Sequence, residues 1–142
     1  MEVTFTMTFV WTDDLATGNP LIDSEHKELI RIIGQLLEAC RSGKGREEML
    51  RTIRFLEEYT IKHFTDEEAL QRKSNYPDLT NHLNYHKQFR TTVQNLSRRI
   101  QAEGASVQLL AEINMNVATW FTNHIRMQDT KVAAHLRSQG IA

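Results

Sequence analysis

Histidine stands out in this chain, because five of its six histidines can be placed on apolar faces of expected helices. His63 and Glu67 are four residues apart, as are His82 and His86, and this spacing places both members of each pair on one helix face. Imidazole nitrogens and carboxylate oxygens are ligands for metal ions such as iron or zinc. Alone, His63 and Glu67 are more typical of an ordinary exposed helix pair, and His82 and His86 favour a metal site no more than an ordinary pair. The chemistry to consider is therefore metal coordination by several helices together.

The remaining candidate ligands stand alone or at an irregular spacing. His26 lies four residues after Ile22 and three before Leu29, so it shares their inward face. Asp129 follows His124 by five residues, and side chains five apart diverge by roughly 140° on a regular α-helix. Asp129 must therefore reach sideways, or the helix must adjust locally.

Together the expected helices offer five imidazoles and two carboxylates to one core. These are His26, His63, Glu67, His82, His86, His124 and Asp129. Burying so many polar groups without partners would cost about 1 to 3 kcal/mol each, which a marginally stable domain could not tolerate. A metal centre removes this cost, because a neutral imidazole binds the ion through one nitrogen and donates a hydrogen bond through the other. Glu68, one residue further round the helix, is expected to be solvated.

Four helical stretches must position these side chains, at roughly residues 21–41, 46–73, 79–103 and 106–137. The glycines and prolines lie mostly between them, as is usual for short helix connections. This pattern predicts an all-α fold, an antiparallel up-down-up-down four-helix bundle. We expect one domain over residues 1–142, with the bundle at 21–137 and an N-terminal extended arm at 1–20. Apolar residues alternate with threonines over Met1–Val10, a run too short to form a sheet alone.

Composition excludes several classes of protein. With 17 basic and 18 acidic side chains, the net charge of -1 gives no reason to expect nucleic acid or an anionic membrane as a partner. Cys40 is the only cysteine, so an intrachain disulfide is excluded and a reducing, cytoplasmic location is expected. The N-terminus lacks the pattern of a signal peptide, and no stretch reaches the roughly 18 apolar residues of a membrane span.

From about Trp11 to Asp129 the sequence resembles the hemerythrin family, specifically its bacterial single-domain members. All seven ligand positions of that family are filled. The motifs that carry the resemblance are Trp11, Ile22-Asp23-x-x-His26-Lys27, His63-Phe64-x-x-Glu67-Glu68, Tyr76-Pro77, His82-x-x-x-His86, and Trp120-x-x-x-His124-Ile125 followed by Asp129.

The resemblance implies reversible dioxygen binding at a non-haem di-iron centre, for oxygen transport, storage or scavenging. Three histidines would complete one iron, two would hold the other, and two carboxylates and an oxo or hydroxo group would bridge them. In that order these residues are His82, His86 and His124; His26 and His63; and Glu67 and Asp129. The two-histidine iron would have one ligand fewer, which leaves a position for dioxygen.

Two aromatic residues precede His124 by four and three positions, Trp120 and Phe121. The resemblance implies that they line the oxygen pocket, although core packing is the ordinary role of such residues. Many hemerythrins have an aliphatic residue at the position of Phe121. An aromatic ring there is expected to change the size of the pocket and the rate of autoxidation.

Alternative functions stay open at this point. The same centre could reduce peroxide or nitric oxide with an external electron donor, or it could sense oxygen or redox state and signal to a partner. Ligand type alone also allows Zn, Mn or Cu. Ferritin-like bundles use Glu-x-x-His repeats and zinc proteases use His-Glu-x-x-His, and the sequence has neither. We expect dioxygen as the ligand, an electron donor as partner if the centre is a reductase, and a monomeric chain.

Overall fold

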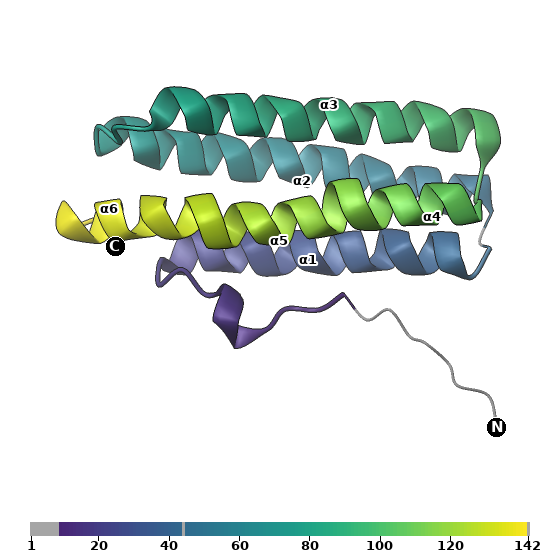
Figure 1. Ribbon diagram of the computed structural model, residues 1–142, viewed down its shortest axis with the longest axis horizontal. Helices are drawn as coiled ribbons and strands as arrows, with labels where there is room; N and C mark the ends of the chain where they lie inside the picture. The colour runs from purple at the N-terminus through teal and green to yellow at the C-terminus, as the bar shows by residue number, and fades with distance from the viewer. Residues whose placement is uncertain (1–8, 44, 142) are drawn as a thin grey trace.

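The computed structural model describes residues 9–43 and 45–141 of the chain. Its helices form an antiparallel up-down-up-down bundle (Figure 1), as the sequence predicted. The first three helices are α1 (Pro20–Arg41), α2 (Arg46–Lys73) and α3 (Leu79–Glu103). The predicted bounds of these helices are confirmed to within one residue.

The fourth helical run is continuous but not regular (Figure 1). Two π-helical segments interrupt its α-helical hydrogen bonding. A π-helical segment bonds each residue to the fifth along instead of the fourth, which widens the turn by one residue. In chain order the run consists of α4 (Val107–Ile113), η2 (Asn114–Thr119), α5 (Trp120–His124), η3 (Ile125–Asp129) and α6 (Thr130–Ser138).

Side-chain caps and a glycine explain where several helices begin and end. Asn19 accepts a hydrogen bond from the backbone N–H of Ile22 at 3.0 Å, and Pro20 occupies the first position of α1. Ser106 caps α4 in the same way through the N–H of Leu109. Helix α3 stops at Gly104, whose φ of 69° suits glycine.

The described part of the N-terminal arm runs beside α1 (Figure 1). It is fixed at one end by Asp23, which accepts hydrogen bonds from the backbone N–H and the hydroxyl of Thr17 at 2.8 and 2.7 Å. At the other end the chain passes close to Gly34, where a Cβ would lie 2.9 Å from the carbonyl oxygen of Phe9. This close approach explains the single glycine inside a predicted helix. The predicted arm segment at residues 1–8 lies outside the described residues.

Apolar side chains close the bundle on both sides of the predicted ligands. The larger cluster includes Leu29, Phe64 and Phe121, whereas Ile22 and Val132 belong to a smaller cluster near the other end. On α1, His26 lies between Ile22, which belongs to the smaller cluster, and Leu29, which belongs to the larger one. The predicted ligands are therefore sealed from water by apolar packing on both sides. Within the described ranges, no helix is both long and apolar enough to cross a membrane.

Candidate metal centre

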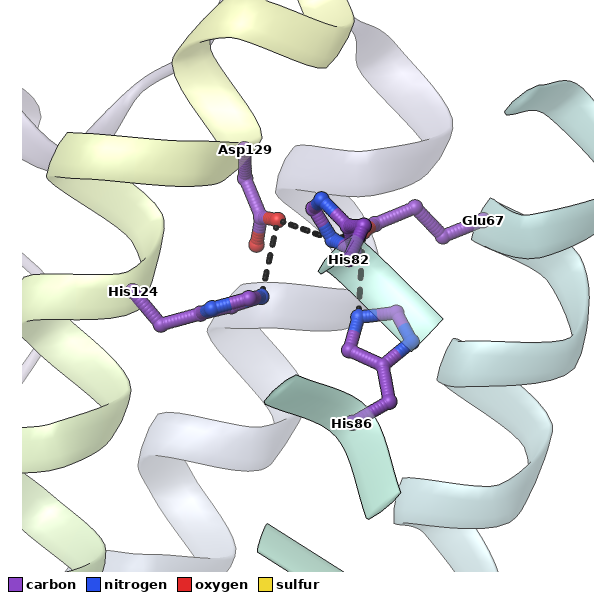
Figure 2. Close-up of side chains that lie close together, drawn as sticks. All are labelled: Glu67, His82, His86, His124 and Asp129. Atoms are coloured by element: carbon purple, nitrogen blue, oxygen red, sulfur yellow. Dashed lines mark ion pairs between the residues drawn. The ribbon is translucent and has the colours of Figure 1, made fainter. Parts of the chain in front are cut away.

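All seven predicted ligands converge in the interior of the bundle, and none is more than 5% exposed. Five of them meet from three helical elements in Figure 2: Glu67 from α2, His82 and His86 from α3, and His124 and Asp129 from the fourth run. Two overlapping groups of donor atoms result. The three-histidine group contains Glu67, His82, His86, His124 and Asp129, and the two-histidine group contains His26, His63, Glu67 and Asp129.

Glu67 contributes one carboxylate oxygen to each group. Its Oε1 lies 2.6 Å from Nε2 of His82 and 3.4 Å from Nε2 of His86. Its Oε2 lies 3.2 Å from Nε2 of His63 and 3.9 Å from Nε2 of His26. The side chain of Gln71, one turn further along α2, donates a hydrogen bond to Oε1 at 3.3 Å. Glu67 thus stands between the two groups, with its two oxygens facing opposite ways.

The two carboxylate oxygens of Asp129 also face different groups. Its Oδ1 lies 3.1 Å from Nε2 of His124 and 3.2 Å from Nε2 of His82 (Figure 2), while its Oδ2 lies 2.8 Å from Nε2 of His26. The π-helical segment η3 makes this possible, because its wider turn returns the fifth residue toward the face of the first. The irregular spacing of His124 and Asp129 in the sequence had required such a local adjustment, and η3 supplies it.

The buried donor atoms form groups that could hold a metal ion. Nε2 of all five histidines, Oε2 of Glu67 and both Asp129 oxygens are buried without a well-aligned hydrogen bond among the described residues. Within each of the two groups, one candidate ligand atom from each residue lies within 4.8 Å of those of the others. Buried polar atoms are rarely left in this state, and a bound metal ion removes the cost. The residues present therefore fit a nitrogen- and oxygen-ligated, non-haem metal centre.

Electrostatics in the cluster raise the pKa of two imidazoles, those of His63 and His82, and lower the pKa of both carboxyls. Burial raises the pKa of Glu67, but contacts with His63, His82 and His86 outweigh it and hold this pKa below its usual range. Burial opposes the same shift in Asp129, and contact with His124 overcomes it. Burial likewise lowers the pKa of His63, but hydrogen bonding to Glu25 and contact with Glu67 raise it to about 10. Burial also lowers the pKa of His82, but contacts with Asp129 and Glu67 raise it to about 9.

These pKa values predict competition between protons and metal. Below about pH 9 both His63 and His82 carry a second ring proton, and hence a positive charge, in the metal-free chain. A metal ion must displace this proton to bind. We expect metal binding at pH 7 to release about two protons, and the affinity of each ion to fall roughly tenfold per pH unit as the pH drops from 8 to 6. Calorimetric titration with Co²⁺ in buffers of different ionisation enthalpy measures the release. A pH-independent affinity would contradict the assignment.

Two acidic residues outside the predicted ligand set complete the surroundings of the centre. Glu25, 3% exposed, accepts a hydrogen bond from Nδ1 of His63 at 3.0 Å. Glu68 accepts from Nδ1 of His86 at 2.8 Å, so the expectation that Glu68 is solvated was wrong. Glu25 and Glu68 adjoin His26 and Glu67 in the sequence. That adjacency is the only sequence signal for them, because each partner histidine lies on another helix.

The two predicted pocket residues lie in different halves of the cluster. The ring of Phe121 meets His26 edge-on, with centroids 5.4 Å apart and planes at 88°. Trp120 instead stacks on His124 at 4.7 Å and on Phe89 at 4.6 Å. Phe121 is therefore beside the two-histidine group, and Trp120 is beside the three-histidine group.

Comparison with known proteins agrees with this geometry. The family described as "Hemerythrin HHE cation binding domain" matches residues 17–136. The chain is 35% identical over 120 residues to Bacteriohemerythrin of Pseudomonas aeruginosa, covering 84% of this chain and 76% of the relative. It is 30% identical over 131 residues to Bacteriohemerythrin of Stenotrophomonas maltophilia, covering 89% and 83%. A crystal structure of a leucine-to-phenylalanine mutant superposes with a TM-score of 0.78 at 26% identity, covering 89% of this chain and 95% of the other.

Proposed function

Because the chain belongs to the hemerythrin HHE cation-binding family, we propose that its buried cluster holds two iron ions and binds dioxygen reversibly. One observation carries the proposal: seven buried donor residues divide into two overlapping groups that share both carboxylates. Imidazole and carboxylate ligands without thiolate suit iron. Such a protein would transport, store or scavenge oxygen.

In the proposed centre each group holds one iron. His82, His86 and His124 serve one ion, and His26 and His63 serve the other. Glu67 and Asp129, which belong to both groups, would hold both ions, and an oxo or hydroxo group would complete the centre. The split of each carboxylate between the groups supports this assignment. When bound, the iron pair supplies the two electrons that dioxygen takes up and recovers them when it leaves.

The two-histidine group is the proposed entrance for dioxygen, because it has four protein ligands where the other group has five. Phe121 is 0% exposed and covers His26 on this side. An apolar wall keeps water and protons away, and this limits the irreversible oxidation of the centre by dioxygen. The chain's own contribution is thus to fix the ligands, leave one position free and keep that position dry.

The visible spectrum tests this function. Reduced, iron-loaded protein exposed to oxygen should develop a ligand-to-iron charge-transfer band that disappears on deoxygenation and returns on a second exposure. Irreversible oxidation without such a band would refute reversible binding. A single turnover with hydrogen peroxide, followed by stopped-flow, separates the reductase alternative, because a carrier should react no faster than it autoxidises.

Phe121 is expected to limit access to the free position. Replacing it with leucine removes a buried ring beside His26, and small ligands should enter faster, by about tenfold for azide at the oxidised centre, with a stability cost of about 1–2 kcal/mol. Stopped-flow absorbance measures the entry rate. An unchanged rate would show that Phe121 does not bound the pocket. Trp120→Leu tests the other half of the predicted pocket: an equal acceleration would place Trp120 at the same opening.

A further inference from the structure

Two carboxylates that are not ligands contact the centre, one in each half. Glu25 on α1 accepts from Nδ1 of His63 on α2 at 3.0 Å, and Glu68 on α2 accepts from Nδ1 of His86 on α3 at 2.8 Å. A carboxylate can only accept, so the imidazole must carry its proton on Nδ1. In the neutral ring that binds a metal, this tautomer leaves the lone pair of Nε2 free on the side of the cluster.

Two other histidines lack a hydrogen-bond partner of this kind. Nδ1 of His26 and Nδ1 of His82 are buried with no hydrogen-bond partner within the described part of the chain. Each metal group therefore contains a histidine anchored by a carboxylate, His63 in one and His86 in the other. The carboxylates also join neighbouring helices, because each hydrogen bond crosses from one helix to the next.

Different cationic side chains lie near the two carboxylates. Glu25 pairs with Nζ of Lys62 at 2.8 Å, and Lys62 also pairs with Asp66 at 2.7 Å. Glu68 has a longer contact, 3.9 Å, to Arg72, and the charges of Arg72 and Arg90 also act on it. Glu25 is 4% and Glu68 14% exposed at the side chain. Their negative charges are thus fixed in a poorly solvated region, where they act strongly on the centre.

We propose that Glu25 and Glu68 are positioning residues, one for each metal ion, that fix the ligating tautomer of His63 and His86 and bias the centre toward its oxidised state. The inference rests on the proposed function only in taking the ions to be iron. Oxidation adds positive charge to the iron pair, and a fixed anion nearby stabilises the more positive state. Hydrogen bonding to an anion also makes each imidazole a stronger donor to the metal.

Two kinds of variant separate the effect of the negative charge from the effect of the hydrogen bond that orients the imidazole. Glu25→Gln and Glu68→Gln keep an oxygen that accepts from Nδ1 but remove the charge. Each should raise the midpoint potential by about 59 mV for a one-electron step, equivalent to a tenfold change in the equilibrium between oxidised and reduced forms. Glu25→Ala and Glu68→Ala remove the acceptor as well, and should weaken Co²⁺ binding by about 10- to 100-fold.

Lys62→Gln gives a test of opposite sign. Lys62 is 57% exposed at the side chain, so its replacement should leave the fold intact. Loss of this cation leaves the negative charge of Glu25 uncompensated, so the midpoint potential of the iron pair should fall. Glu28→Gln is the matched control, because Glu28 lies one turn beyond Glu25 on α1 and pairs with Arg31 in solvent. Its potential should equal that of the wild type.

The experiment is an anaerobic redox titration of the iron-loaded chain, followed by its absorbance. A rise for both glutamine variants and a fall for Lys62→Gln would support the inference. Potentials indistinguishable from those of Glu28→Gln, or a rise for Lys62→Gln, would overturn it. No dioxygen is present, so failure of reversible oxygen binding would leave this result standing. If the wild type retained no iron, the proposed function would fail, and unchanged Co²⁺ affinities in the alanine variants would overturn the positioning role separately.

Discussion

Glu67→Ala is expected to abolish the retention of both metal ions, because one oxygen of Glu67 faces each group. His63→Ala and His82→Ala should each weaken mainly one ion, since each imidazole belongs to one group only. The loss should exceed the roughly 10- to 100-fold that removal of an outer partner costs. The substitution also leaves Asp129 as the only carboxylate that the two groups still share.

The metal-to-protein ratio after gel filtration in metal-free buffer measures this effect. Wild type should retain two ions per chain, each histidine variant at most one, and Glu67→Ala none. Glu58→Ala is the matched control, because Glu58 lies on the exposed face of the same helix α2. Two ions retained by either histidine variant would show that the ligand assignment is wrong.

Removal of the metal is expected to have the second-largest effect, on stability. The metal-free interior holds imidazoles and carboxylates whose Nε2 and oxygen atoms lack well-aligned hydrogen bonds. An ion that binds the folded chain alone stabilises it by about 4.1 kcal/mol when its free concentration is 1,000 times its Kd. For a chain of this size, such a gain raises Tm by roughly 8–16 °C per ion.

Thermal unfolding followed by circular dichroism, with buffered free metal and then with a chelator, measures the difference. Glu67→Ala should unfold at the same temperature in both conditions, because it retains no ion to lose. An identical Tm for the wild type with and without metal would mean that the cluster does not bind metal tightly. In that case the cluster would be a purely structural polar core.

The helices were predictable because each is bounded by local chemistry that acts within a few residues. Asn19 and Pro20 start α1, and Gly104 ends α3. The same periodicity placed the histidines inward, because residues four apart share a face. The sequence did not determine whether the fourth helical run is a regular α-helix. The spacing of His124 and Asp129 showed that a regular helix would fail, but either a sideways reach or a π-helical turn could have solved it.

The surroundings of the ligands were less predictable, because they depend on contacts between helices. Glu68 looked solvated from its position on α2 alone, and only the approach of α3 places His86 against it. Trp120 and Phe121 are adjacent in the sequence, yet they face different halves of the centre. Sequence spacing defines the face of a helix but not which neighbouring side chain reaches that face.

Oxygen stoichiometry is the most direct test of reversible dioxygen binding by this chain. Reduced protein with two irons per chain is mixed with oxygenated buffer in a sealed oxygen-electrode cell and then purged with argon. Reversible binding predicts the uptake of one dioxygen per chain and its recovery in the purge gas over repeated cycles. Uptake without recovery, or no uptake by a chain that retains both irons, would contradict it.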